Sequence, residues 1–496
     1  MDQLKVILWG QEIGRLIRKA DTRQIYFLFN PSETGSIPDI APIAAPVSKA
    51  GNRLLIYGEE RFPYQGLPPF IADSLPDAWG DTLFDKWVHD NRIPNSKVTP
   101  LYKLMFIGTR GMGALEYEPA AEELAHSRNI DLGALYDISL KVLDSRAEAS
   151  LNTSENLTLQ ALLAVGTSAG GRQMKAVIAV NRETGEIRSG QTAAPEGFDY
   201  CILKFGNDKM PVAEIEMAYC AMATDAGITM MRSDLLRADG TNHFLTERFD
   251  RLEGKKIHIQ TLAAINPDAR NYEDLVATCR ELQLTEEEIE QVFLRMTFNV
   301  MCNNTDDHNK NFSFMLPQGG KWQLAPAYDM TFIFNGYATG PNQARRFGIL
   351  GKTSGVTEQD LLEFARRYGI KDAQPMIDRV AKSISRFAEY AERYGISHPW
   401  RDIIGKTLND TLVEYGYLEL PTGIDAYDRY GRHLTDLAIT VNSKGHYAVA
   451  ATIDGDKRRR FIRPNNPIYR EMQSTDLLTM TSEQKTELAE RLFPVL

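Results

Sequence analysis

The chain contains little cysteine and no long apolar run. Its four cysteines include no Cys-x-x-Cys pair, so neither a zinc site nor a disulfide framework is indicated, and this cysteine usage fits a reducing cytoplasm. No segment approaches the roughly 18 uninterrupted apolar residues of a membrane span, and the amino terminus lacks a charged leader followed by an apolar stretch. We therefore expect a soluble, untargeted cytoplasmic protein with no membrane partner.

An excess of positive charge is also absent. The chain carries 56 Lys and Arg residues against 66 Asp and Glu residues, which gives a formal net charge of −10. Because a protein whose main surface binds nucleic acid usually has a net basic face, direct binding to DNA or RNA is not expected. A length of 496 residues at about 150 residues per domain predicts several domains.

The most informative stretch is a polar cluster at 303–313, which lies between segments apolar enough to form core. Four residues separate Asp306 from Asn311, the interval of the protein-kinase catalytic loop, in which the Asp orients the attacking hydroxyl and the Asn holds a metal ion. Asp329 follows after a short apolar run and could supply a second magnesium ligand. Asp307 is the alternative to Asp306, but the spacing to Asn311 favours Asp306.

A glycine-rich segment at 166–175 leads directly into an apolar, strand-like run. Its hydroxyls, Arg172, Lys175 and backbone N–H groups could fold over the oxygens of a triphosphate, although an ordinary turn is the alternative. It is not a Walker A loop, because no Gly-Lys-Ser/Thr sequence opens a helix there. The segment therefore indicates a phosphate loop of another kind.

Lys204 lies in an otherwise apolar strand-like run at 200–205. A lysine is rarely fully buried without an anionic partner, so an inward Lys204 needs a carboxylate or a nucleotide phosphate. An edge strand with this lysine in solvent is the alternative. Glu216, near the start of the helix expected over 212–226, is a candidate carboxylate partner, as in the strand-lysine to helix-glutamate pair of kinases.

The remaining signals predict an α+β chain. Strands are expected over 5–10, 24–29, 244–251, 437–441, 447–453 and 460–462, the first two as a hairpin and the last three as an antiparallel meander. Helices are expected at about 74–88, 285–302, 357–394, 399–415 and 482–492, with capping boxes at 285–288 and 357–360.

Taken in order, these segments resemble the HipA-family toxin kinases of bacterial type II toxin–antitoxin systems over about residues 1–400. The residues 168–175 are similar to the family's Ser-x-x-Gly-x-Gln-x-Lys loop, although Arg172 and Met174 depart from the residues that relatives often carry. The other matching segments are the ATP-lysine strand at 202–204, the hinge at 247–251, the catalytic loop at 305–313 and the metal-binding motif at 328–329.

The resemblance implies a two-lobed protein-kinase-like α+β fold that uses ATP and Mg²⁺. It implies Asp306 as the catalytic residue, Asn311 and Asp329 as metal ligands and Ser168 as a candidate autophosphorylation site. It implies nucleotide contacts from Gly170, Gly171, Arg172, Gln173, Lys175, Lys204, Glu247, Phe249, His308, Lys310 and Asn311. From the residues themselves, His308 is interpreted as a structural hydrogen-bonding group rather than a metal ligand.

The resemblance also implies a domain order. We expect an amino-terminal subdomain over 1–125, the rest of the amino-terminal lobe over 126–250, an all-α carboxy-terminal lobe over 251–420, and an extension of unassigned role over 421–496. The basic run at 457–460 in that extension is interpreted as a solvated strand end.

The implied activity is phosphorylation of a serine or threonine in a protein substrate, often an aminoacyl-tRNA synthetase in this family. A separate HipB-like antitoxin would be the partner and would make the only, indirect, contact with DNA. Two other classes stay open: a metal-dependent phosphohydrolase built on the acidic cluster, and a catalytically silent co-repressor. The complete set of Lys204, Asp306, Asn311 and Asp329 argues against a silent protein.

Overall fold

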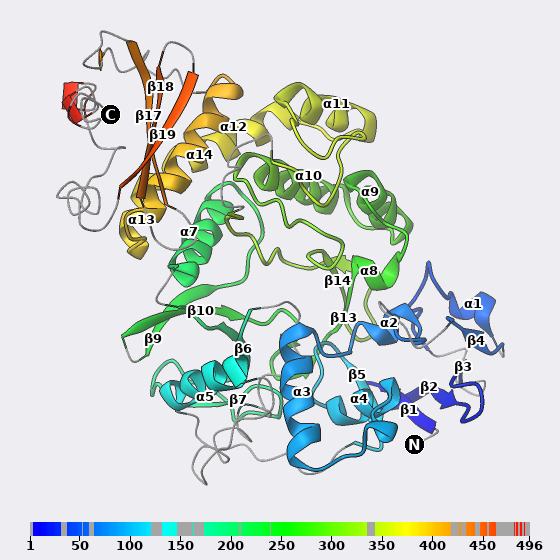
Figure 1. Ribbon diagram of the computed structural model, residues 1–496. Helices are drawn as coiled ribbons and strands as arrows, with labels where there is room; N and C mark the ends of the chain where they lie inside the picture. Colours follow the sequence, from blue (N-terminus) through cyan, green and yellow to red (C-terminus); the bar gives the residue numbers. More distant parts are fainter. Residues whose placement is uncertain are drawn as a thin grey trace. The chain divides into compact units, whose positions relative to one another are not determined.

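The computed structural model describes most of the chain and divides it into two compact units (Figure 1). The described residues are 3–30, 37–51, 53–58, 64–120, 131–145, 162, 173–207, 210–238, 240–334, 343–417, 426–427, 433–441, 447–453, 456–462, 481, 483–484, 487–488 and 491. Unit 1 comprises Met1–Asn207, Met230–Ile289 and His308–Tyr328, and unit 2 comprises Asp208–Thr229, Glu290–Asp307 and Asp329–Leu496. Because both units are discontinuous, neither coincides with a domain expected from the sequence.

Unit 1 begins with a five-stranded antiparallel sheet in the order β4-β3-β2-β1-β5. Its strands are β1 (Gln3–Leu8), β2 (Gln11–Arg18), β3 (Ile25–Phe29), β4 (Leu55–Ile56) and β5 (Leu115–Glu118). The expected hairpin between 5–10 and 24–29 is wrong, because β2 lies between these strands and pairs with both. On β2, Ile13 and Leu16 are both fully buried, because the pairing with β1 shifts register at Ile13, between Glu12 and Gly14.

Helices lie between the later strands of this sheet along the chain, and one more follows β5. They are α1 (Val47–Ala50), α2 (Pro69–Ala72), α3 (Ala78–Asp90), the 3₁₀ turn η1 (Asn95–Lys97), α4 (Pro100–Ile107) and α5 (Leu132–Ser145). Asp77 caps α3 by accepting a hydrogen bond from the backbone N–H of Gly80, and Thr99 caps α4 in the same way through Tyr102. The expected helix at about 74–88 is thus confirmed as α3, with its start at Ala78.

A second five-stranded antiparallel sheet has the order β7-β6-β8-β10-β9. Its strands are β6 (Lys175–Val180), β7 (Ile187–Ser189), β8 (Asp199–Lys204), β9 (Ser233–Ala238) and β10 (Thr241–Glu247). The central position of β6 and β8 explains their apolar composition, because all of β6 is buried and β8 alternates between buried and half-buried residues. This sheet carries Lys204 at the end of β8.

The rest of unit 1 mixes strands with helices. It contains β11 (Arg251–Leu252), β12 (Lys255–Lys256), β13 (His258–Thr261), α8 (Leu262–Ile265), α9 (Tyr272–Glu281), β14 (Ser313–Leu316) and β15 (Gln323–Leu324). The expectation of an all-α segment over 251–420 is therefore wrong. β13, β14 and β15 are short, and β14 pairs with β13, more than 50 residues away along the chain, so local periodicity did not reveal them.

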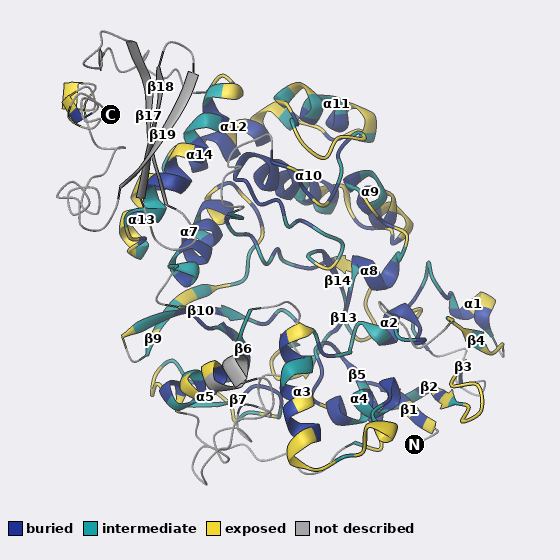
Figure 2. Cartoon of the chain, viewed as in Figure 1, coloured by how far each residue is buried: buried dark blue, intermediate teal, exposed yellow. Residues whose placement is uncertain are grey.

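Unit 2 is mainly helical, with α7 (Val212–Asp225), α11 (Glu358–Tyr368), α12 (Ala373–Ile384), α13 (Phe387–Tyr394) and α14 (Trp400–Glu414). The long helix α10 (Glu286–Met301) starts in unit 1 with the expected capping box between Thr285 and Glu288 and continues into unit 2 as a buried helix (Figure 2). The capping box of α11 is also confirmed. Within the described residues, no helix has the length and apolar character needed to cross a membrane.

The carboxy-terminal strands form an antiparallel meander in the order β16-β17-β18-β19. They are β16 (Ala426–Tyr427), β17 (His433–Val441), β18 (Tyr447–Ile453) and β19 (Asp456–Ile462). The expected three-stranded meander is confirmed, with β16 added at its edge. The basic run 457–460 belongs to β19, and most of the helix expected at about 482–492 lies outside the described residues.

His258 on β13 is a buried histidine, which should make the stability of the protein depend on pH. It is 1% exposed, and its Nε2 lies 3.1 Å from Nε2 of Gln260, while its Nδ1 lacks a hydrogen-bond partner in the described structure. Burial lowers the pKa of His258 from 6.5 to about 3. The imidazole of His258 takes up a proton near pH 6.5 in the unfolded chain but only near pH 3 in the folded chain. The unfolding free energy therefore has its full value, with respect to His258, above pH 6.5 and falls as the pH drops toward 3.

We expect the unfolding free energy of the wild type to fall by up to about 1.4 kcal/mol per pH unit below pH 6.5 through His258 alone. The His258→Asn variant should lose that component, so its denaturation midpoint should depend less on pH between 7.5 and 5. Urea denaturation of both proteins at several pH values measures the difference. Parallel curves for the two proteins would show that His258 does not control acid stability.

Candidate active site

Two neighbouring carboxylates, Asp306 and Asp307, lie in different environments within unit 2. The Asp307 side chain is 0% exposed, and its Oδ2 accepts hydrogen bonds from Nε and Nη2 of Arg345 at 3.1 and 2.9 Å. The Asp306 side chain is 44% exposed, and its Oδ1 lies 2.6 Å from Nε of the exposed Arg346. Asp307 is thus tied into the structure, whereas Asp306 is accessible to a substrate.

Side-chain amides hold the backbone on either side of these carboxylates. Asn303 has a left-handed backbone with φ 58°, and its Nδ2 donates to the carbonyl of Ile333 at 3.0 Å. Asn304 donates to the carbonyl of Asp329 at 3.2 Å, and Asp329 itself has φ 54°. Non-glycine residues rarely adopt positive φ, and such residues gather at functional sites. Asn304 therefore fixes the backbone that carries the proposed metal ligand.

The second half of the loop, from His308 onward, belongs to unit 1. Nδ1 of His308 accepts a hydrogen bond from the backbone N–H of Lys310 at 3.2 Å, and its carbonyl accepts one from the N–H of Asn311 at 2.8 Å. His308 therefore takes part in the hydrogen bonds of this turn, and its expected contact with the nucleotide stays a prediction. The hydroxyl of Tyr328 donates to the carbonyl of Lys310 at 2.7 Å, and the Tyr328 ring stacks on Phe249 at 5.9 Å.

Lys204 and Lys175 occupy facing positions on β8 and β6 but have different surroundings. Lys204 is half-buried, and its Nζ lies 5.7 Å from the ring centre of Phe244 on β10. Lys175 is 2% exposed, and its Nζ lies 3.2 Å from Oδ2 of Asp77, whose pKa is raised by burial and lowered by the lysine. In this structure Lys204 thus remains the accessible cation of the pair, and Lys175 binds the residue that caps α3.

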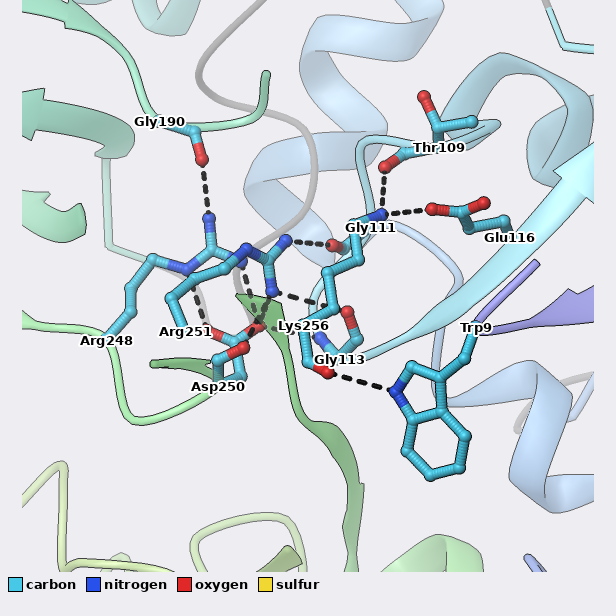
Figure 3. A network of polar contacts seen from close by, with 10 residues as sticks. All are labelled: Trp9, Thr109, Gly111, Gly113, Glu116, Gly190, Arg248, Asp250, Arg251 and Lys256. Atoms are coloured by element: carbon cyan, nitrogen blue, oxygen red, sulfur yellow. Dashed lines mark hydrogen bonds and ion pairs between the residues drawn. The ribbon is translucent and has the colours of Figure 1, made fainter. Parts of the chain in front are cut away.

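The hinge expected at 247–251 is held by a buried network (Figure 3). The carboxylate of Asp250 is 0% exposed and accepts hydrogen bonds from Nε and Nη2 of Arg248, each at 2.8 Å, and from the N–H of Gly113 at 2.7 Å. Burial raises the pKa of Asp250, but Arg248 and Arg251 together lower it to about 2. The carboxylate therefore stays ionised and joins the hinge to the loop at 109–113.

The same network extends toward the first sheet. Figure 3 shows Arg251 directed at the carbonyls of Gly111 and Gly113, both at 3.3 Å from its guanidinium nitrogens. Lys256 donates to the carbonyl of Thr109 at 2.5 Å and forms an ion pair with Glu116 at 2.7 Å. Glu247, the first residue of the hinge, is half-buried and binds Arg182 at 3.1 Å.

The donors proposed for magnesium have suitable chemistry. Asn311 and Asp329 are both half-buried and supply oxygen ligands, which Mg²⁺ prefers, and such sites are normally completed by phosphate oxygens and water. In the described part of the chain, no three His, Cys, Asp or Glu side chains are grouped so that they could hold a metal ion. A two-metal cluster built on Asp306, Asp307 and His308 is therefore unsupported, since Asp307 is also committed to Arg345.

Part of the predicted site lies outside the described residues, namely Ser168, Gly170, Gly171 and Arg172. Gln173, the first described residue of that segment, donates from Nε2 to the carbonyl of Phe205 at 3.2 Å. Among the residues that the sequence did not assign are Asp77, Asp250 and the two arginines Arg345 and Arg346. Arg345 and Arg346 lie 38 and 40 positions along the chain from Asp307 and Asp306, so no local pattern connects them with the carboxylates that they bind.

Comparison with known proteins assigns the family. The model of the HipA N-terminal domain matches residues 4–118, and the model of the HipA-like C-terminal domain matches residues 167–388. The chain belongs to the HipA family. The second match contains the glycine-rich segment, Lys204, the hinge, the catalytic loop and Asp329, so every motif of the predicted site lies in the HipA-like C-terminal domain.

Two bacterial relatives are similar in sequence. A Haemophilus influenzae protein named "Putative kinase" is 26% identical over 260 residues, which are 44% of this chain and 75% of that protein. The Sinorhizobium fredii protein "Putative kinase Y4dM" is 23% identical over 148 residues, 28% of this chain and 36% of that protein. These similarities, with the two domain matches, make the chain a HipA-family kinase.

The fold is also shared with a solved structure. A chain of the Shewanella oneidensis MR-1 complex of HipA, HipB and operator DNA matches with a TM-score of 0.57 and 15% identity, covering 83% of this chain and 96% of that chain. The expected kinase-like α+β fold is confirmed. The stretch from 421 onward lies beyond both domain matches.

Proposed function

We propose that the chain is an ATP- and magnesium-dependent serine/threonine protein kinase of the HipA toxin type. The observation that carries the proposal is the contrast between Asp306, accessible at 44% exposure, and Asp307, which is buried under Arg345. Of the two carboxylates, the accessible one has the kinase-loop spacing to Asn311. A carboxylate in that position can bind and orient an acceptor hydroxyl.

The proposed roles follow the family motif residue by residue. Lys204 binds the α- and β-phosphates, and the segment 166–175 covers the γ-phosphate. Asn311 and Asp329 would hold Mg²⁺, which neutralises the charge that develops on the phosphate oxygens. Asp306 orients the acceptor hydroxyl and accepts its proton.

The step balances in the usual way for phosphoryl transfer. The acceptor oxygen forms a bond to the γ-phosphorus as the bond from that phosphorus to the β,γ-bridging oxygen breaks, and ADP leaves. Little covalent chemistry is required from the protein, so orientation and charge neutralisation supply the rate. Apart from Asp306, which accepts the proton of the acceptor hydroxyl, the side chains contribute by position and charge.

The other classes are less well supported. A metal-dependent phosphohydrolase would use Asp307, which is bound to Arg345, and would not require Lys204. A silent co-repressor would need neither an accessible Asp306 nor a cation on β8. The kinase proposal is the only one of the three that uses all of these residues.

The proposal includes partners. Since the similar Shewanella chain is in a complex of HipA, HipB and operator DNA, we propose that a separate HipB-like antitoxin binds this chain and provides its only link to DNA. The protein substrate is proposed to belong to translation, with an aminoacyl-tRNA synthetase as the first candidate. Ser168 is proposed as an autophosphorylation site, whose charge of about −2 would oppose binding of the phosphates.

The test uses the purified full chain with γ-labelled ATP and a bacterial lysate. We expect acid-stable label on serine or threonine of one or more lysate proteins and of the chain itself, with the self-label mapping to Ser168. Removal of magnesium with EDTA should abolish all transfer. Label that appears only as inorganic phosphate would contradict the kinase proposal and favour a phosphohydrolase.

A further inference from the structure

Two adjacent arginines of unit 2, Arg345 and Arg346, bind the two adjacent carboxylates of the catalytic loop. The Arg345 side chain is 4% exposed, and it also donates to the carbonyl of Asn304 at 3.3 Å. The Arg346 side chain is 65% exposed, and its Nε lies 2.6 Å from Oδ1 of Asp306. One arginine is therefore part of the core, while the other binds the proposed catalytic carboxylate at the surface.

The segment that carries these arginines is fixed along the catalytic loop. The backbone N–H of Arg346 donates to the carbonyl of Thr305 at 3.0 Å, and the N–H of Arg345 donates to the carbonyl of Thr353 at 2.7 Å. Nε2 of Gln343 donates to the hydroxyl of Thr305 at 2.9 Å. These hydrogen bonds fix the backbone at Arg346. The side chain of Arg346 therefore extends toward Asp306 from a fixed backbone position.

Such an exposed ion pair contributes little to folding, because water screens it and both side chains lose rotamer freedom. The main effect of this ion pair is therefore on the properties of Asp306. A guanidinium that donates to one carboxylate oxygen restricts the rotation of the carboxylate and reduces its negative charge. Both effects would assist a group that must bind a hydroxyl while a polyanionic phosphate approaches it.

We propose that Arg346 is a positioning residue for phosphoryl transfer, which orients Asp306 and reduces its repulsion of the γ-phosphate. The proposal rests on the proposed kinase function and adds a residue from outside the catalytic loop to it. Arg345 serves the same loop differently, since it compensates the buried charge of Asp307.

The test compares Arg346→Ala, Arg346→Lys and a control, Arg366→Ala. Arg366 is also an exposed arginine of unit 2 in an ion pair, with Glu363 at 2.7 Å, but it lies on α11. The steady-state rate is measured with γ-labelled ATP and dephosphorylated casein as a general Ser/Thr acceptor. Thermal unfolding of each variant is followed in parallel.

We expect Arg346→Ala to lower kcat by about 10- to 100-fold while KM for ATP changes by less than about twofold, because the orientation of Asp306 and not nucleotide binding is affected. Arg346→Lys should retain an intermediate rate. Free guanidinium at millimolar concentration should restore part of the rate of Arg346→Ala and none of that of Asp306→Asn. Arg366→Ala should match the wild type, and all three arginine variants should unfold at the wild-type temperature.

An unchanged kcat in Arg346→Ala would overturn the proposal. An increased kcat would also overturn it, because the ion pair would then inhibit the reaction. A loss of rate that neither lysine nor guanidinium restores would also overturn it. Failure of the wild type to label casein, itself or any lysate protein would instead refute the proposed function, so the two failures are distinguishable.

Discussion

Replacement of Asp306 by asparagine is expected to lower the rate of phosphoryl transfer by about 10²- to 10⁴-fold, because the amide cannot accept the proton of the acceptor hydroxyl. The side chain keeps its size, and the ion pair with Arg346 that is lost is exposed, so the unfolding free energy should change by less than about 1 kcal/mol. The rate is measured as label transfer from γ-labelled ATP, and stability is measured by urea denaturation.

Asp307→Asn is the matched comparison, because it makes the same chemical change one residue away. Here the lost charge leaves Arg345 buried with a neutral partner, so we expect a loss of stability of several kcal/mol, roughly 3–5, and a lower yield of folded protein. We therefore expect Asp306→Asn to be folded but inactive and Asp307→Asn to be unstable. Wild-type rates in Asp306→Asn would refute the role given to this residue.

The second large effect is expected at Asp250. Its replacement by alanine removes the carboxylate that pairs with both Arg248 and Arg251, whose side chains are 0% and 5% exposed. Two buried guanidinium groups would then face each other without compensation. We expect a loss of about 3–5 kcal/mol in unfolding free energy, measured from the urea midpoint.

Asp234→Ala is the control for this experiment. Asp234 also binds an arginine, Arg182 at 3.0 Å, but its side chain is 57% exposed, so its loss should cost less than about 1 kcal/mol. Equal effects of the two substitutions would show that the Asp250 network does not stabilise the hinge. A large effect of Asp250→Ala alone would make the loop at 109–113 a structural support of the hinge.

Much of the fold could be predicted where the signals are local. The capping boxes at 285–288 and 357–360 identified the starts of α10 and α11, because the cap residues lie within one turn of each other. The meander was likewise visible from alternating strands joined by short turns. Each of these elements is specified by residues close together in the sequence.

Elements that depend on distant partners were missed. The polar residues of β2 led to its interpretation as part of a turn. It is recognised as a strand only in the assembled sheet, where β1 and β3 pair with its two edges. The strands β13 and β14 are four residues each and pair across 51 residues of intervening chain. Their short length gives no period, so only the assembled sheet identifies them.

The candidate site divides in the same way. Lys204, Asp306 and Asn311 could be proposed from the sequence because their types and intervals are characteristic of phosphoryl transfer, and their roles stay predictions. Arg346, which binds Asp306, could not, because an ion pair between residues 40 positions apart leaves no local pattern. Sequence therefore indicated the chemistry of the site, and the structure supplied its supports.

The most direct test of the kinase account is a single transfer experiment with ATP labelled separately on the α- and γ-phosphates. The purified chain is incubated with magnesium, each labelled ATP and a bacterial lysate, and the labelled proteins are hydrolysed to identify the modified amino acid. We expect γ-label, and no α-label, on phosphoserine or phosphothreonine. Transfer of α-label, or release of γ-label solely as inorganic phosphate, would contradict the account.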